Sequence, residues 1–277
     1  MSTTSKQRLD VILVEKGLVE SREKAKRIIL SGSVYVAGQK VDKAGTLVSP
    51  QDEIHVEGDP IPFVSRGGLK LQKALDLFKP PVKDRVYMDV GASTGGFTDC
   101  LLQYGAKKVY SIDVGYGQLA WSLRQDKRVV VMERTNIRNV TKDDFEELPQ
   151  GAVIDVSFIS LKLVLPVVKK ILLPDSHIIA LIKPQFEAGR EKVGKKGVVR
   201  SVETHKEVLQ DILFACRQLG FVIKNLSYSP VKGPKGNIEF LAHLYYHSQE
   251  ESSYDNKIDI EKLVNKVVDS AHRELKG

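Results

Sequence analysis

From Gly67 onward the sequence alternates between segments with helical periodicity and short apolar runs that have the length of buried strands. Strands joined through helices lie parallel in one sheet, so this alternation predicts an α/β domain with helices on both faces of a mostly parallel sheet. The last two strands are joined only by loop 229–237, which is too short for a crossover helix, so the last strand is expected to run antiparallel. The expected helices are 67–78, 96–104, 117–126 and 202–219, and the expected strands are 85–90, 108–113, 129–133, 151–156, 177–183, 221–228 and 238–246.

The segment before this alternation has a different pattern. Helical periodicity covers 8–17 and 21–30, and short alternating strands follow at 34–36 and 53–56, which predicts a small α+β domain. Two prolines shortly after the second strand disfavour helix and predict an extended connection. The expected organisation is a small domain at 1–59, a linker at 60–66, the α/β domain at 67–247 and a polar, weakly helical tail at 248–277.

Charge is distributed unevenly along the chain. The formal net charge is +7, and the excess lies in residues 65–250, which carry 28 basic and 20 acidic side chains. The densest stretch, 190–200, has five basic residues and one acid. A polyanionic partner such as RNA fits this excess, and a solvated basic surface without a partner fits it about equally well.

Several classes of protein are disfavoured by the sequence. The first 16 residues are polar and charged, unlike a signal peptide, and the most apolar region, 152–173, is interrupted by charges and a proline. The two cysteines, Cys100 and Cys216, fit no metal-binding spacing and are interpreted as reduced core thiols. We therefore expect a cytoplasmic protein with no membrane segment and no metal ion.

A glycine-rich turn follows the first strand of the α/β domain. Segment 91–97 lies between a strand end and a helix, where glycines let the backbone turn sharply and approach a ligand closely. Asp113 comes 22 residues after Gly91, at the end of the next strand, a spacing that suits hydrogen bonds to a ribose diol. Neither the dinucleotide pattern nor the Walker A pattern fits, which favours a ligand without phosphates such as S-adenosylmethionine. The expected cofactor residues are Gly91, Ala92, Ser93, Thr94, Gly95, Gly96, Phe97 and Asp113, with Asp155 and Phe158 from a later strand end.

The same turn permits two other interpretations. Gly91-Ala-Ser93-Thr-Gly95 matches the nucleophile elbow of serine hydrolases, G-x-S-x-G. A histidine-containing oxyanion motif is missing upstream, and the downstream histidines fall within predicted strands or helices or at a strand end. The third interpretation is a tight turn that binds nothing.

Four charged residues are predicted to meet beside this turn. In an open parallel sheet, ligands bind beyond the carboxyl ends of the strands. Asp155 and Lys183 each end a predicted parallel strand, and Glu239 begins the final antiparallel strand, so it reaches the same edge. Lys70, in the first turn of the helix before the first strand, should face this edge too. Each residue alone could be an ordinary surface ion pair, but four at one edge indicate a site.

Such a set suits methyl transfer to a hydroxyl. A ribose 2′-hydroxyl is a poor nucleophile and must lose its proton, which a lysine can accept in its neutral form. Positive charge from the sulfonium and Lys70 favours that form of Lys183, while Asp155 and Glu239 orient the ammonium groups. Phe158 could stack on the adenine or be a core aromatic. Loops 190–200 and 232–236 could hold phosphates or be merely solvated.

At this point the motifs resemble known families. Arg8-Leu-Asp, Gly17-Leu-Val-Glu-Ser-Arg22, Ala25, Gly32-Ser-Val-Tyr-Val36 and Gly38 resemble the S4 RNA-binding domain. Ser65-Arg-Gly-Gly-Leu-Lys70, Asp89-Val-Gly-Ala-Ser-Thr-Gly-Gly-Phe97, Asp155-Val-Ser-Phe-Ile-Ser160, Lys183-Pro-Gln-Phe-Glu187 and Gly236-Asn-Ile-Glu239 resemble the TlyA or hemolysin A family, whose catalytic domain is FtsJ-like. The resemblance spans residues 7–247.

This resemblance implies S-adenosylmethionine-dependent 2′-O-methylation of cytidine in ribosomal RNA of the large subunit and, in some members, of the small subunit. It carries a Lys-Asp-Lys-Glu catalytic tetrad onto Lys70, Asp155, Lys183 and Glu239. The candidate RNA contacts are Arg8, Arg22, Lys26, Arg27, Arg66, Arg190, Lys192, Lys195, Lys196, Lys232 and Lys235. Two other functional classes stay open: an S4-tethered ribosome-assembly factor without turnover, and a pore-forming hemolysin, which the lack of a membrane segment disfavours.

Overall fold

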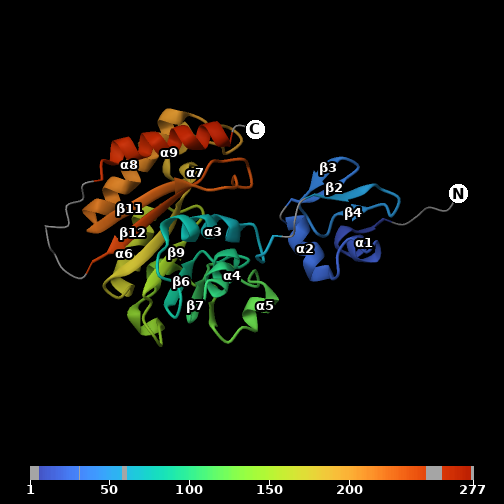
Figure 1. Ribbon diagram of the computed structural model, residues 1–277, viewed down its shortest axis with the longest axis horizontal. Coiled ribbons are helices and arrows are strands. Elements are labelled where there is room, and N and C mark those ends of the chain that lie inside the picture. The colour runs from blue at the N-terminus through green and yellow to red at the C-terminus, as the bar shows by residue number, and fades with distance from the viewer. Residues whose placement is uncertain (1–5, 31, 58–60, 248–257, 276–277) are drawn as a thin grey trace. The chain divides into compact units, whose positions relative to one another are not determined.

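The computed structural model describes residues 6–30, 32–57, 61–247 and 258–275. The expected boundary between residues 59 and 60 and the first part of the expected tail, 248–257, lie outside these ranges. The chain forms two compact units, residues 1–68 and residues 69–277, and each is described by itself. Figure 1 shows the elements of both units.

The first unit packs two helices against short strands. Helices α1 (Leu9–Glu15) and α2 (Arg22–Leu30) contribute a small core that includes the fully buried Leu13 and Ile29. A three-stranded antiparallel sheet has the order β3-β2-β5, and β1 pairs with β4. The strands are β1 (Gln7–Arg8), β2 (Val34–Val36), β3 (Gln39–Val41), β4 (Leu47–Val48) and β5 (Ile54–Val56). The α+β prediction is confirmed; β2 and β5 correspond to the predicted strands, whereas β1, β3 and β4 were not predicted.

The second unit is built on a seven-stranded sheet in the order β11-β12-β10-β9-β6-β7-β8. All neighbouring strands pair parallel except β12, which runs antiparallel to both β10 and β11. This arrangement confirms the predicted Rossmann-like sheet with its last strand reversed. The strands are β6 (Val86–Val90), β7 (Lys108–Ile112), β8 (Val129–Met132), β9 (Gly151–Ile154), β10 (Ser176–Ile182), β11 (Phe221–Tyr228) and β12 (Phe240–Tyr246).

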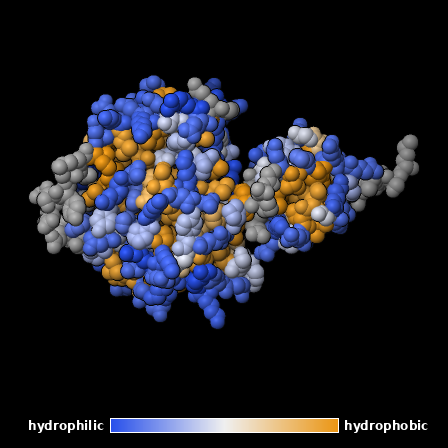
Figure 2. Space-filling model, in the orientation of Figure 1, coloured by the Kyte–Doolittle hydropathy of each residue, from blue (hydrophilic) through white to orange (hydrophobic). Residues whose placement is uncertain are grey.

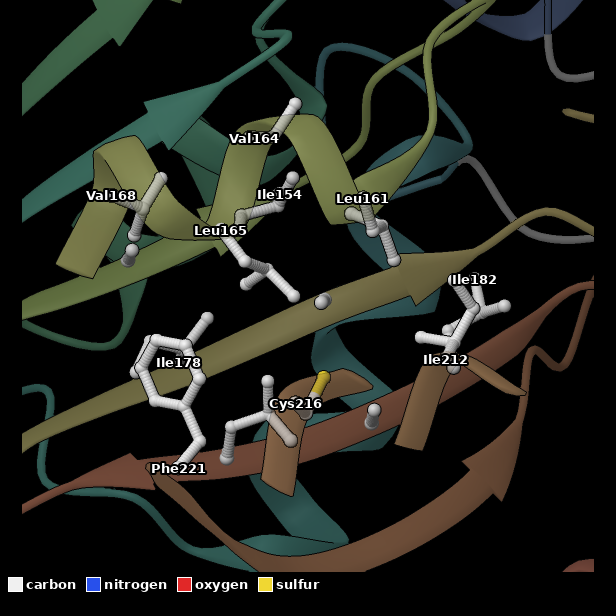
Figure 3. Close-up of a cluster of buried hydrophobic side chains, with 14 of the residues drawn as sticks. Ile154, Leu161, Val164, Leu165, Val168, Ile178, Ile182, Ile212, Cys216 and Phe221 are labelled. Atoms are coloured by element: carbon white, nitrogen blue, oxygen red, sulfur yellow. The ribbon is translucent and has the colours of Figure 1, made fainter. Parts of the chain in front are cut away.

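Helices cover the sheet and seal its core. Leu165 and Val168 of α6 pack with strand residues such as Ile178 and with Ile212 and Cys216 of α8 (Figure 3). Both cysteines are free and buried, as predicted. The helices of this unit are α3 (Gly67–Phe78), α4 (Gly96–Gln103), α5 (Trp121–Arg124), α6 (Leu161–Ile171), α7 (Pro184–Glu187), α8 (Val202–Gln218) and α9 (Ile260–Glu274), with short 3₁₀ turns at Ile137–Asn139, Lys142–Asp144 and Arg190–Lys192.

One predicted helix is much shorter than expected. The sequence predicts a helix over 117–126, but only the single turn α5 forms. Gly117 has φ +72°, in the left-handed region that ends regular helix, and Ala120 before the turn is extended. Leu119 and Leu123 instead pack where a Cβ on Gly95 would lie, so this segment backs the glycine-rich turn.

The C-terminal segment corrects the expectation of a polar tail. Residues 260–274 form α9, which packs against α8 and β11. Its apolar face, which includes Val264 and Val268, is buried in the main core, and its N-cap Asp259 accepts a hydrogen bond from the backbone of Lys262. This helix is therefore an integral layer of the second unit.

The surface of the second unit mixes polar and apolar residues without a continuous apolar belt on the face that Figure 2 shows. Among the residues that the structure describes, no helix is long and apolar enough to cross a membrane.

Candidate active site

The glycine-rich turn lies directly beyond the end of β6. Gly91 has φ +88° and Gly95 has φ +96°, both in the left-handed region that favours glycine. A Cβ on Gly91 would lie 2.6 Å from the carbonyl oxygen of Asp155, at the end of the neighbouring strand β9. The turn therefore requires glycine for both its conformation and its close approach to the next strand end.

Asp113 ties this turn to the end of β7. Its Oδ2 accepts a hydrogen bond of 2.7 Å from the backbone N–H of Ser93, and its Oδ1 accepts one of 2.7 Å from Gly115. A carboxylate has about four acceptor sites, so each oxygen keeps capacity for a ligand. Asp113 is thus held in place by two backbone groups and remains able to accept hydrogen bonds from a diol.

A cavity of about 740 Å³ opens between these strand ends. Its lining includes Gly91, Ser93, Asp113, Asp155 and Phe158, five of the predicted cofactor residues. The structure does not bring the other five to the lining. Ala92, Gly95, Gly96 and Phe97 are buried within the turn and the start of α4, and Thr94 is half-buried. The lining also includes residues that the sequence did not single out: Gln118, Thr135, Asn136 and Arg138.

The cavity fits an adenosine-type cofactor. Its size lies in the range of pockets that enclose a small ligand, which is about 300–1,000 Å³. An oriented carboxylate, an open glycine backbone and an exposed aromatic ring together suit a ribose diol, a closely packed chain and a flat base. No lysine is among the described residues that line this cavity.

Asp89, near the end of β6, is a buried acid that the sequence did not assign. Its Oδ2 accepts a 2.7 Å hydrogen bond from Thr98, whose hydroxyl also lies 2.7 Å from that of Ser111. Burial, opposed by the Thr98 bond and reinforced by Asp155, raises the pKa of Asp89 to about 7. This network braces β6, β7 and α4 directly beneath the glycine-rich turn.

The four predicted catalytic residues meet at one place. Lys183 Nζ lies 2.5 Å from Asp155 Oδ1, and Lys70 Nζ lies 2.6 Å from Glu239 Oε2. The two pairs are joined because Lys70 Nζ also lies 4.0 Å from Asp155 Oδ2. Residues from α3, β9, β10 and β12 therefore form one cluster beside Gly91.

This cluster is buried and formally neutral. The relative exposure is 6% for Lys70, 9% for Lys183 and 1% for Glu239, so each charge is largely removed from water. Buried charges are tolerated when they are paired, and each of the two lysines here lies against a carboxylate. Two further side chains complete the pairing: Ser157 accepts a 3.0 Å hydrogen bond from Lys183, and Gln185 donates one of 3.3 Å to Glu239.

Phe158 is not a core aromatic. It is 89% exposed, has φ +63°, and its ring lies 4.8 Å from that of Phe186. An aromatic residue held in the left-handed region and in solvent is unfavourable by itself, which points to a binding role at the cavity mouth.

The hydrolase interpretation finds no support at Ser93. The Ser93 hydroxyl lies 3.3 Å from Gln118, while four of the described histidines pair with one another. His177 pairs with His243 at 2.9 Å, beside the amino-terminal end of β10 and thus at the opposite edge of the sheet, and His205 on α8 pairs with His272 on α9. Within the described part of the chain, no histidine is placed to activate this serine.

The predicted phosphate-binding residues gather around a second hollow. A cavity of about 880 Å³ is lined by Arg190, Lys195, Lys196 and Lys235, and it shares Phe186 with the cofactor cavity. The remaining two cations are placed differently. Lys192 forms an exposed ion pair of 2.5 Å with Glu207, and Lys232 is half-buried.

In the first unit, two of the candidate RNA contacts share one buried carboxylate. The side chain of Asp10 has no exposed surface, and it accepts hydrogen bonds from Arg8 at 2.9 and 3.1 Å and from Arg22 at 3.1 Å. The two arginine side chains stay about half exposed, so Asp10 orients them at the surface. Lys26 is exposed and Arg66 is half-buried, while the side chain of Arg27 lies outside the described part of the structure.

Comparison with known proteins identifies a family for each of the two units. The family sequence model of the FtsJ-like methyltransferases matches residues 63–246, and the family sequence model of the S4 domain matches residues 7–54. The Bacillus subtilis protein YqxC is 52% identical over 99% of this chain and 97% of its own length. The Mycobacterium tuberculosis protein named 16S/23S rRNA (cytidine-2'-O)-methyltransferase TlyA is 40% identical over 94% of this chain and 97% of its own length. A solved structure from Streptococcus thermophilus, 46% identical, superimposes with a TM-score of 0.77 and covers 99% of this chain and 98% of that one.

The family models match the two parts of the chain that form the small α+β unit and the seven-stranded sheet. They confirm the predicted S4 domain and the predicted methyltransferase domain. The chain therefore belongs to the TlyA family of FtsJ-like methyltransferases, enzymes in which an S4 domain precedes the catalytic domain.

Proposed function

We propose that this enzyme transfers a methyl group from S-adenosylmethionine to the 2′-hydroxyl of cytidine in ribosomal RNA. The observation that carries the proposal is the buried cluster of Lys70, Asp155, Lys183 and Glu239, which opens beside a cavity that suits an adenosine-type cofactor. The assignment of cytidine in ribosomal RNA as the acceptor follows from the name of the Mycobacterium tuberculosis relative. We further propose that the enzyme acts in the cytoplasm, where that substrate is found.

The cofactor is proposed to bind in the 740 Å³ cavity. Asp113 would accept hydrogen bonds from the ribose diol, Gly91 would allow the close approach of the chain, and Phe158 would flank the adenine. When bound, S-adenosylmethionine supplies a methyl group on a positively charged sulfur, which becomes a neutral thioether after transfer.

Lys183 is proposed to remove the proton from the attacking hydroxyl. Its Nζ is fixed by Asp155 and Ser157, which leaves one further direction for the substrate oxygen. Lys183 acts after its ammonium has released a proton to solvent: the hydroxyl proton passes to the neutral amine as the ribose oxygen forms its bond to the methyl carbon and the carbon–sulfur bond breaks. Asp155 then stabilises the resulting ammonium, and Lys70 and Glu239 hold Asp155 in position.

The exposed cations are proposed to hold the RNA backbone. Arg190, Lys195, Lys196 and Lys235 line the hollow beside Phe186, which follows Lys183 by three residues in the chain. The paired arginines Arg8 and Arg22 offer a second set of phosphate contacts in the S4 domain. These contacts would supply affinity without sequence discrimination, because phosphates carry no base information.

The proposal is tested by nucleoside mass spectrometry. Ribosomal RNA from cells that lack this enzyme is incubated with the protein and isotope-labelled S-adenosylmethionine, then digested to nucleosides. The expected product is labelled 2′-O-methylcytidine. Label on a base or on another nucleoside would contradict the proposed acceptor, and labelled product from a protein without Lys183 would contradict the proposed mechanism.

A further inference from the structure

Glu187 is a half-buried acid just outside the catalytic cluster, and the mechanism above does not use it. It ends the single-turn helix α7, four residues after Lys183. Burial raises the pKa of its carboxyl group, although hydrogen bonds from Ser160 and Leu161 oppose this. A carboxylate kept in such surroundings needs a structural or chemical reason.

Both oxygens of Glu187 are engaged by the loop that follows β9. Glu187 Oε2 accepts a 2.6 Å hydrogen bond from the hydroxyl of Ser160, and Oε1 accepts one of 2.9 Å from the backbone N–H of Leu161. Leu161 is the first residue of α6, so its N–H is one of the donors that a helix leaves unsatisfied at its start. Glu187 therefore fastens the far end of this loop.

The near end of the same loop is fastened by Lys183. Asp155 and Ser157 both contact its ammonium group, at 2.5 and 3.0 Å. Segments 155–161 and 183–187 are thus joined at both ends, and in the middle the rings of Phe158 and Phe186 lie 4.8 Å apart. The two segments form a short ladder that leaves adjacent parallel strands, β9 and β10.

The loop needs a second anchor because its conformation is strained. Phe158 has φ +63°, which is unfavourable by roughly 1–3 kcal/mol for a residue with a side chain and persists only where neighbouring structure enforces it. Without Glu187, the far end of the loop would lose the hydrogen bonds at Ser160 and Leu161, and the strained segment around Phe158 could relax toward an ordinary conformation. Ser157 would then move relative to the Lys183 ammonium.

We propose that Glu187 is a positioning residue that fixes the loop 155–160 and thereby sets the orientation of Lys183 for methyl transfer. The inference rests on the proposed function, because it assigns Glu187 a role in that reaction. Glu187 itself lines neither the cofactor cavity nor the second hollow, although its hydrogen-bond partner Ser160 lines the cofactor cavity. Its largest effect should therefore appear in the rate of the chemical step at saturating substrates, because Lys183 acts in that step.

The experiment compares single-turnover rates of methyl transfer at saturating RNA and S-adenosylmethionine. Glu187→Ala should lower the rate about 10- to 100-fold, the scale expected for a misplacement of roughly 1 Å. The dissociation constant for RNA should stay within about threefold of wild type, and that for S-adenosylmethionine should rise by less than the rate falls, because Phe158 of the displaced loop lines the cofactor cavity. Glu187→Gln should recover most of the rate, because its amide can accept from Leu161 and donate to Ser160. An Ala variant as fast as wild type would overturn the inference.

A second pair of variants separates positioning from general loss of structure. Asp211→Asn removes the exposed 2.5 Å ion pair with Lys162 on the same helix α6, and it should leave the rate unchanged. Ser157→Ala should slow wild type several-fold but add less than twofold in the Glu187→Ala background, because the loop is already displaced there. Fully multiplicative effects would overturn the inference. If the wild-type enzyme itself forms no 2′-O-methyl product, the proposed function fails instead.

Discussion

The molecule uses positive charge in two contrasting ways. Lys70 and Lys183 are almost completely buried, and each is paired with a carboxylate at about 2.5 Å. Arg190, Lys195 and Lys196 are exposed on a loop that lines an open hollow. Buried pairs have a fixed geometry and lose much when one partner is removed, whereas exposed cations contribute small, salt-screened amounts. The contrast separates a region built for chemistry from one built for affinity.

The largest expected difference concerns stability. Lys70→Ala leaves the carboxylate of Glu239, which is 1% exposed, without its 2.6 Å partner. Breaking a buried pair in this way costs about 3–5 kcal/mol of unfolding free energy. The matched change Lys196→Ala, on the exposed loop, should stay within about 0.5 kcal/mol. Denaturant unfolding of both variants measures this, and equal losses would remove the distinction between the two regions.

The next effect concerns cofactor affinity. Gly91→Ala places a Cβ 2.6 Å from the Asp155 carbonyl and should weaken S-adenosylmethionine binding by about 30-fold or more. Gly117→Ala is a matched control, because Gly117 also has positive φ but a Cβ there meets nothing within 4 Å. The affinity of the Gly117→Ala variant for S-adenosylmethionine should change only a few-fold. Calorimetric titration distinguishes the two, and similar values for both would mean that backbone strain alone, and not the close approach, is what matters.

The exposed region should respond to salt. Lys195→Ala and Lys196→Ala are each expected to weaken RNA binding by about three- to tenfold and to reduce the slope of log affinity against log salt by about 0.7–0.9 per lost phosphate contact. The rate at saturating RNA should not change. Lys266→Ala, an exposed lysine on α9, is the charge-matched control and should have no effect. If the slope of log affinity against log salt is the same in these two variants as in wild type, the assignment of the loop lysines as phosphate contacts is wrong.

The smallest effect comes from a buried histidine. Burial, assisted by His272, lowers the pKa of His205 to about 4, from an ordinary value near 6.5. The unfolded chain therefore binds the proton more readily, so stability is complete above pH 6.5 and is lost as pH falls toward 4. Between pH 7 and 5.5 this amounts to roughly 1 kcal/mol.

The thermal unfolding midpoint, measured across this pH range, checks the effect. His205→Gln should remove about half of the pH dependence, because the pKa of His243 is also lowered to about 4 and it titrates in the same window. His55→Gln changes an exposed histidine of β5 and should leave the dependence intact. An undiminished slope in His205→Gln would show that His205 is not the group responsible.

The sequence was informative where a simple spatial rule applies. The ends of parallel strands share one edge, so Asp155, Lys183 and Glu239 could be brought together without coordinates. The contacts that Ser157 and Gln185 make with the cluster were not predicted, although both residues lie inside motifs that resemble the TlyA family. Their contacts depend on the orientation of a side chain in a loop, and the periodicity of a sequence does not predict that orientation.

The prediction of a polar C-terminal tail was wrong for a different reason. Helix α9 has many charged residues, and its average polarity suggested a tail. Its apolar residues nevertheless recur at helical spacing, from Ile260 through Val264, Val267, Val268 and Ala271, and all five are buried. Periodicity, and not composition, carried the signal. In the S4 domain, strands β2 and β5 were predicted, whereas β1, β3 and β4 were not.

The most direct test of the central claim is a single-turnover measurement on Lys183→Ala, with S-adenosylmethionine affinity determined on the same preparation. The transferred label is followed into 2′-O-methylcytidine of ribosomal RNA. Loss of a general base predicts a rate at least about 10²- to 10⁴-fold lower, with cofactor affinity within a few-fold of wild type. Methyl transfer at the normal rate by this variant would contradict the assignment of Lys183 as the base and, with it, the proposed role of the buried cluster.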